Sequence, residues 1–265
     1  MARPKLNPPC TGWQRDLPGP NEPIEEAPTL RWFAPTSLNS ICLELPRNTS
    51  GMRGTMLWLS AFPAIWLFLS TKNMVRAIFA PLFHAEGQVI LVSLFAIICT
   101  SLCVWAMLFS IRADVAPPRD LPIRFNRSRR KVYVYGFHRV WWNPFARWYV
   151  TTASYDWDDL RAEQWKVRGV TANGALIVKE GVSIAVVKPG THEVIDRFEL
   201  SSRAGNTSNV WAYVCAYMQH GCNGLNPSEV ESRDVNDVPP YNLALRLAPK
   251  VEWPPAMDRE SRTAP

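Results

Sequence analysis

The chain has 265 residues, of which 47% are hydrophobic and 20% charged, and its formal net charge is +6. This length allows one or two domains with a substantial core. The spacing of the six cysteines excludes a standard zinc ribbon or zinc finger, since none forms a CxxC pair. The cysteines are Cys10, Cys42, Cys99, Cys103, Cys215 and Cys222, and a cytosolic placement predicts reduced thiols.

Two uncharged runs predict a pair of transmembrane helices. They cover residues 54–71 and 87–111, and no comparable run occurs elsewhere in the chain. At about 1.5 Å per residue they would extend roughly 27 and 37 Å, against a hydrocarbon core of about 30 Å. The alternative, two buried helices of a soluble protein, is disfavoured because the remaining sequence is too polar to enclose them. Pro63 predicts a kink within the first run.

The distribution of Lys and Arg predicts the orientation of this hairpin. Residues 1–53 contain no apolar core of a signal peptide, so the first run is expected to remain as an anchor. The loop at residues 72–86 holds only two cations, whereas the segment after the second run holds seven: Arg112, Arg119, Arg124, Arg127, Arg129, Arg130 and Lys131. Because cations resist translocation, both termini should be cytosolic and the loop periplasmic, in a multi-pass protein of a bacterial inner membrane.

Residues 1–53 are rich in proline and predict an extended cytosolic arm. Two of its stretches, 30–33 and 41–45, are too apolar for a fully solvated tail, so part of the arm is expected to dock on the membrane or on the cytosolic domain. Residues 226–265 predict a second proline-rich tail, in which Tyr241–Leu247 is apolar enough to add an edge strand.

The segment at residues 112–225 predicts a β-rich domain. Ile123–Phe125 and Lys131–Tyr135 read as two strands around the turn 126–130, since Val and Tyr alternate with a period of two. Another strand is expected at Trp148–Thr152. The turn signals Asn173-Gly174, Glu180-Gly181 and Pro189–His192 then separate three further strands at 175–179, 182–188 and 193–200.

A helix at about 207–220 closes this domain, with Thr207 or Ser208 as its cap and Gly221 as its stop. Its apolar stripe includes Trp211, which should pack on the sheet. The predicted fold is therefore a membrane α-helical hairpin plus an α+β cytosolic domain. That domain is an antiparallel meander or barrel with one C-terminal helix, which resembles the pleckstrin-homology fold in topology.

The acidic cluster Asp156, Asp158 and Asp159 has two interpretations. It could bind a cation or supply an acid and a base. Carboxylates at this position also suit a helix start or an exposed turn, and we favour this structural interpretation over a functional one. The chain has no glycine-rich phosphate loop, GxSxG elbow or HExxH helix. We therefore expect no cofactor, no metal and no enzymatic activity.

The basic turn has three interpretations. Its residues are Arg124, Arg127, Arg129, Arg130 and Lys131, which begin about a dozen residues after the second run. They could serve only as a topology signal on a solvated hairpin, or they could contact anionic lipid, where each cation gains about 1 kcal/mol. Nucleic acid is disfavoured as a partner, because the nearby aromatic residues lie on alternating strand faces and form no stacking platform.

Several stretches resemble an uncharacterised family of proteobacterial two-span inner-membrane proteins. They include Arg119–Tyr133, Tyr155–Glu163, Val194–Phe198 and Trp211–Gly221. Members often lie near type VI secretion genes, which implies an immunity or accessory protein that acts by contact with a secreted effector or secretion component. The family implies no catalytic residues. The other function classes are a lipid- or envelope-sensing scaffold and a membrane-bound enzyme of unknown reaction.

Overall fold

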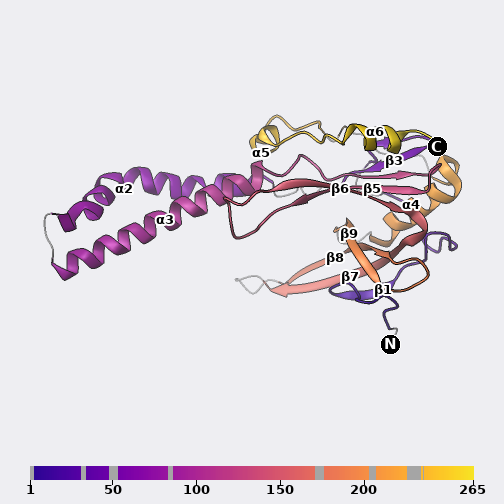
Figure 1. Ribbon diagram of the computed structural model, residues 1–265, viewed down its shortest axis with the longest axis horizontal. Helices are drawn as coiled ribbons and strands as arrows, with labels where there is room; N and C mark the ends of the chain where they lie inside the picture. The colour runs from indigo at the N-terminus through magenta and orange to yellow at the C-terminus, as the bar shows by residue number, and fades with distance from the viewer. Residues whose placement is uncertain are drawn as a thin grey trace.

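Two antiparallel β-sheets and a long helical hairpin make up the computed structural model of the protein (Figure 1). It describes residues 3–30, 34–47, 53–82, 86–170, 176–202, 207–225, 234 and 236–265. The hairpin projects from one end of the domain that the sheets form, and the C-terminus lies at the opposite end (Figure 1). The predicted α+β class is confirmed.

The five-stranded sheet has the order β2-β3-β4-β5-β6 and the four-stranded sheet the order β1-β7-β8-β9. The strands of the first are β2 (Ser37–Leu38), β3 (Cys42–Leu45), β4 (Ile123–Asn126), β5 (Lys131–His138) and β6 (Tyr149–Asp156). Those of the second are β1 (Trp13–Asp16), β7 (Leu160–Val170), β8 (Leu176–Val187) and β9 (Val194–Ser201). The predicted hairpin around residues 126–130 is confirmed as β4–β5.

The main core lies between the two sheets and helix α4 (Thr207–His220), which contacts β4 of one sheet and β7, β8 and β9 of the other. The predicted C-terminal helix is confirmed, and Gly221 follows it with φ +70°. Trp211 on α4 is buried, and its ring lies 5.3 Å from that of the fully buried Trp157. Trp157 in turn meets Phe125 of β4 edge to face.

The strands do not form one continuous meander, and the described residues form no closed barrel. The chain leaves β6, makes a 3-10 turn at Trp157–Asp159 and enters β7 in the other sheet. This corner places the Trp157 side chain between the sheets, where its burial removes a large apolar surface from water. Of the two structural interpretations of residues 156–159, the helix start is wrong because a strand follows them, and the 3-10 turn agrees with the other, a turn.

The expected turn at Glu180-Gly181 is also wrong, since β8 runs through both residues. Gly181 lies opposite Trp165 of β7, and a Cβ atom there would stand 2.6 Å from the Trp165 ring and 2.3 Å from the carbonyl oxygen of Ser201. The glycine gives room to a large cross-strand neighbour and does not reverse the chain. Asn173-Gly174 lies outside the described residues, while the turn at 189–192 does connect β8 to β9, with Gly190 at φ +72°.

The proline-rich terminal segments belong to the domain. The N-terminal segment docks, because β1 pairs with β7 and β3 pairs with β4. In the C-terminal segment, α6 (Pro255–Arg262) contacts β4 and β5. The edge strand expected at Tyr241–Leu247 is wrong, since α5 (Leu243–Leu247) forms there, with the Asn242 side chain accepting a hydrogen bond from the Leu245 N–H at 3.0 Å.

The hairpin consists of α1 (Thr55–Leu59), α2 (Ala61–Phe79), a 3-10 turn at Ala80–Leu82 and α3 (Gly87–Val115). The chain changes helix at Ser60, three residues before Pro63. A proline ring clashes with the carbonyl four residues earlier, which accounts for an interruption of the helix one turn before Pro63. Residues 72–82, predicted as loop, are helical.

Candidate functional site

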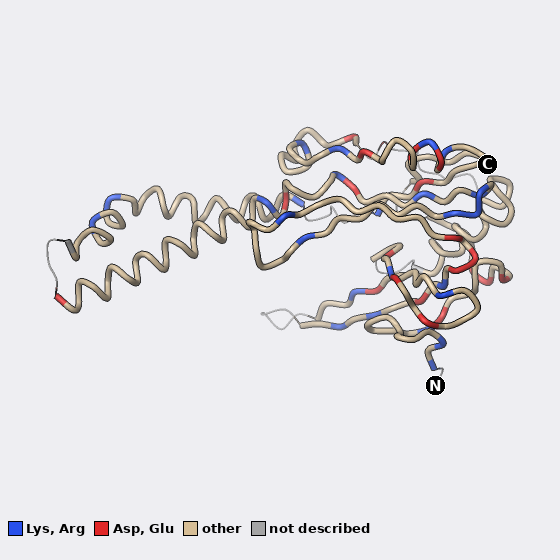
Figure 2. Tube along the Cα trace, viewed as in Figure 1, with Lys and Arg blue, Asp and Glu red and all other residues tan. Residues whose placement is uncertain are grey.

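The helical hairpin exposes most of its large apolar side chains. Phe68 on α2 and Leu91 and Phe95 on α3 are each about 70–80% exposed. Figure 2 shows no charged residue along most of the hairpin, apart from a few near its tip and its base. One helix, α3, is long and apolar enough to cross a membrane by length and composition. A continuous apolar surface of this size requires a cover, either lipid or another apolar partner.

Small and hydroxylated residues line the contact between α2 and α3. Ser93 and Ala96 of α3 are buried there, and the Ser93 hydroxyl donates to the carbonyl oxygen of Ala77 on α2 at 2.5 Å. Thr100 donates to the carbonyl of Ala96 at 2.7 Å. Helices that pack within lipid use such residues because they allow close approach and satisfy their hydroxyls internally.

A polar cluster fixes the base of the hairpin to the domain. The buried carboxylate of Asp114, near the end of α3, accepts hydrogen bonds from the N–H groups of Gly54 (3.0 Å) and Leu57 (2.8 Å) at the start of α1. Arg53 donates to the carbonyl oxygens of Asp114, Pro117 and Pro118, while the Asn242 side chain before α5 donates to the Arg53 carbonyl. The start of α1 and the end of α3 are thus held together, and α5 is joined to both.

Sequence reasoning missed this cluster. A signal was present, because Arg53 immediately precedes the first uncharged run and Asp114 is the first acidic residue after the second. The sequence alone does not show that these two residues meet, because the hydrogen bonds between Arg53 and the end of α3 form only when the hairpin does.

The acidic residues Asp156, Asp158 and Asp159 surround the corner between the sheets. Only Asp158 lines a surface pocket, of about 360 Å³, together with residues of the N-terminal segment, Arg161 and His192. Hydrogen bonds from Arg130 and Asn21 lower the pKa of the Asp158 carboxyl. This carboxylate is therefore ionised and engaged in a polar contact, an arrangement that suits a structural link better than a general acid.

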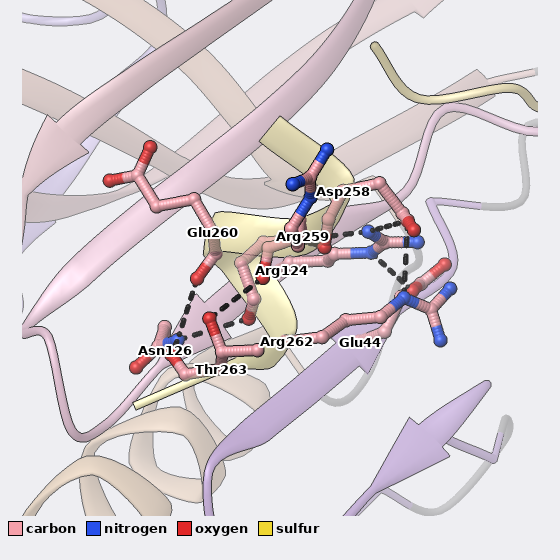
Figure 3. Close-up of polar contacts among 9 residues, drawn as sticks. Glu44, Arg124, Asn126, Asp258, Arg259, Glu260, Arg262 and Thr263 are labelled. Atoms are coloured by element: carbon pink, nitrogen blue, oxygen red, sulfur yellow. Dashed lines mark hydrogen bonds and ion pairs between the residues drawn. The ribbon is translucent and has the colours of Figure 1, made fainter. Parts of the chain in front are cut away.

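Arg124, the first cation of the predicted basic turn, is 2% exposed and lies in a buried polar network (Figure 3). It donates to Glu44 of β3 at 2.5 Å and to Asp258 of α6 at 2.6 Å, and its guanidinium lies 4.5 Å from the centre of the Trp253 ring. Asn126, at the end of β4, donates to backbone carbonyls of α6 and the residue after it. The network fastens the C-terminal segment to the sheet.

The other cations of the turn also contact protein groups. Arg129 donates to the carbonyls of Thr263 and Ala264, Arg130 pairs with Asp158, and Lys131 pairs with Glu260. The guanidinium of Arg127 lies against Gly221. Because these contacts include the C-terminus, the turn lies at the end of the domain opposite the hairpin (Figure 1). Lipid contact by this turn stays a prediction that the geometry does not favour.

The buried thiols are poorly suited to nucleophilic chemistry. Burial raises the pKa of Cys10 and Cys42 to about 11 and that of Cys215 to about 12, so all three stay protonated at neutral pH. Among the described residues, no group of three or more His, Cys, Asp or Glu side chains is placed to hold a metal ion.

One comparison with known proteins gives a match. The profile of a family of unknown function (DUF6708) matches residues 100–265, which include the end of α3, strands β4–β9 and the helices that follow. Neither the curated proteins nor the solved structures give a match.

Proposed function

Since the chain belongs to this family of unknown function, which assigns no activity, we propose a function from the structure: the protein is a membrane-anchored binding protein. Helices α2 and α3 cross a bacterial inner membrane as a hairpin and hold the two-sheet domain on its cytosolic surface. The observation that carries the proposal is the exposed apolar surface of the hairpin, fastened at its base by Arg53 and Asp114.

Strand pairing supports two crossings. β3 precedes the hairpin and β4 follows it, yet the two strands pair from Leu45↔Ile123 to Cys42↔Asn126. β1 likewise pairs with β7. A chain that crossed the bilayer once, through α3 alone, would leave these partners on opposite sides. If α3 spans the membrane, α2 must return through it, with Lys72 and Arg76 reaching the outer interface near the hairpin tip.

The proposed role is contact with another protein and not catalysis. The pairing of Asp158 with Arg130 and the protonated buried thiols favour this class. More specifically, we propose an immunity or accessory protein for type VI secretion effectors. This part of the proposal rests on the resemblance of the sequence alone.

A lipid- or envelope-sensing scaffold is the second candidate. Its support is topological, because strands β2–β6 form one sheet, β7–β9 lie in the other and a helix follows β9, an order similar to that of a pleckstrin-homology-like domain except that β1 joins the second sheet. A membrane-bound enzyme of unknown reaction is the third candidate and has no specific observation in its favour.

Reporter fusions test the anchor. A phosphatase inserted between Leu82 and Glu86 should be active in the periplasm, whereas one fused after Pro265 should be inactive there, since Lys and Arg hold both termini in the cytosol. Activity at Pro265 together with inactivity at the loop would contradict the topology.

Deletion of the gene beside a neighbouring effector gene tests the immunity role. Sister cells should then intoxicate the deletion strain, and the full-length protein should protect it. A matched variant replaces residues 55–113 with a short Gly-Ser linker, which is feasible because the Gly54 N–H lies 3.0 Å from the Asp114 carboxylate. It should protect poorly, since anchoring raises the effective concentration towards partners at the membrane. Absence of intoxication would exclude immunity, and full rescue by the linker variant at native expression would make the anchor dispensable.

A further inference from the structure

Three segments of the domain share an unusual composition at the end from which the hairpin projects. They are residues 139–150 from the end of β5 into β6, residues 166–170 and 176–179 at the described ends of the β7–β8 pair, and residues 239–250 around α5. None contains Asp or Glu, and each contains at least two Lys or Arg. We call these three segments the collar.

The first collar segment lies against the end of α3. The guanidinium of Arg112 donates to the carbonyl of Pro144 and lies 4.9 Å from the centre of the Trp148 ring, and Phe109 meets the same ring edge to face. Trp148 is buried by these contacts, but Trp141, Trp142 and Phe145 of the same segment point outward, with exposed fractions of 72%, 59% and 72%. The exposed aromatic side chains are therefore held at the level where the uncharged part of α3 ends.

The other two segments add apolar side chains at the same end. Tyr241, Leu243 and Leu247 are exposed around α5, which contacts α3. Val170 and Leu176 face each other at the tip of β7 and β8 and are also exposed. Figure 1 shows that this tip runs toward the hairpin side of the domain and extends past β1 and β9.

The charges of the collar contrast with those at the opposite end. Arg139, Arg147, Arg168 and Arg246 are exposed among its apolar side chains. At the far end, the cations of the β4–β5 turn lie beside the acidic residues Asp158 and Glu260 and pair with them. Lys166, also in the collar, pairs with Glu180 at 3.3 Å, whereas the four exposed arginines lie among aromatic and aliphatic side chains. Such a mixture suits a surface of anionic phospholipid, where indole rings prefer the headgroup region and cations meet phosphate.

We propose that the collar lies in the cytosolic interface of the membrane that the hairpin crosses. The domain then contacts anionic headgroups through the collar and is not attached through the hairpin alone. This inference rests on the proposed membrane anchoring. The bilayer is the expected occupant because the collar continues the apolar surface of α3 and carries the charge opposite to that of phospholipid.

A depth measurement on the full chain tests the proposal. A fluorescent amino acid is placed at one of three sites: Phe145 in the collar, Leu102 on the exposed face of α3, or the exposed Ser128 in the far turn as the matched control. Each protein is reconstituted into vesicles of phosphatidylcholine and phosphatidylglycerol that carry a nitroxide quencher either at the headgroup or at the middle of the acyl chain. The probe at 145 should be quenched several-fold more by the headgroup nitroxide than the probe at 128, and the probe at 102 should respond to the mid-chain nitroxide.

The outcomes separate the two proposals. If 102 is quenched by the mid-chain nitroxide but 145 responds no more than 128, the collar proposal is overturned and the membrane anchor stands. If 145 responds to the headgroup nitroxide and 102 to neither, the spanning hairpin is overturned; the collar then contacts headgroups without an anchor, and the collar proposal as stated falls with the anchor. A probe at 145 that is shielded from water but unquenched by either lipid would mean that protein covers the collar, which overturns the proposal.

The charge requirement has its own control. The double variant Arg139→Gln/Arg147→Gln should lose the extra headgroup quenching at 145 that phosphatidylglycerol gives over pure phosphatidylcholine, while Arg130→Gln in the far turn should retain it. Equal quenching in both lipids for the unmodified collar would overturn the role of anionic headgroups.

Discussion

Replacement of Arg124 by alanine should destabilise the domain far more than replacement of a neighbouring cation. Arg124→Ala leaves the Glu44 carboxylate, which is 3% exposed, without its ion-pair partner in the core. Removal of one member of a buried pair typically costs about 3–5 kcal/mol. The lost pair with Asp258, which is 41% exposed, adds less than about 1 kcal/mol, and the contact with Trp253 adds a comparable amount. For a chain of this size, a loss of about 3–5 kcal/mol corresponds to a melting temperature lower by roughly 6–20 °C.

The assay is thermal unfolding of the full-length protein in detergent, followed by circular dichroism. Arg130→Ala is the matched control, because Arg130 lies in the same turn but pairs with Asp158 at the surface, so its loss should cost less than about 1 kcal/mol. The double variant Arg124→Met/Glu44→Leu should recover most of the loss, since it removes both buried charges. A decrease for Arg124→Ala no larger than that for Arg130→Ala would refute the reasoning. A double variant as unstable as the single one would show that packing, and not the unpaired charge, determines the loss.

Four further substitutions have expected outcomes in the same unfolding assay. Trp211→Ala removes a buried ring and should cost about 3–5 kcal/mol, whereas Trp142→Ala, at an exposed site, should leave the melting temperature nearly unchanged. Burial raises the pKa of Asp120 to about 6, so the folded state binds its proton more tightly than the unfolded state does. The stabilisation of the folded state by this protonated carboxyl is present at low pH and is lost as the pH rises through about 6. Asp120→Asn should therefore reduce the decrease in unfolding free energy between roughly pH 4 and 7. Gly181→Ala should destabilise the β7–β8 pair, because the new Cβ atom would clash with the Trp165 ring; an unchanged melting temperature would contradict the assigned contact.

Elements set by local pattern could be predicted from the sequence. The β4–β5 hairpin follows from alternating Val and Tyr around a polar turn, and α4 follows from an apolar stripe that ends at Gly221. Both signals lie within a short stretch of chain. Gly181 was interpreted as a turn residue because the sequence alone does not reveal that Trp165 lies across from it.

The features that the sequence did not predict depend on partners far away along the chain. The pairing of β1 with β7 joins segments separated by the whole hairpin, and no periodicity within the proline-rich arm indicates it. Arg124 was grouped with the other cations of its turn because its burial depends on Glu44, far earlier in the chain, and on α6, far later. The exposed aromatic residues of the collar were passed over for the same reason, since their significance depends on their position beside α3.

The pairing of β3 with β4 has a consequence for biosynthesis. When β3 has been synthesised, its partner β4 has not yet been translated. At about 5–20 residues per second, the ribosome needs several seconds to translate the hairpin that separates them. With the proposed two-span topology, co-translational insertion of the hairpin into the membrane would come before completion of the five-stranded sheet. A chain that inserts only α3 would strand β3 and β4 on opposite sides, where the sheet cannot form. The domain would thus fold only in chains whose hairpin is correctly inserted. A substitution that impairs insertion of α2 would leave the domain unfolded and sensitive to proteases in the cell.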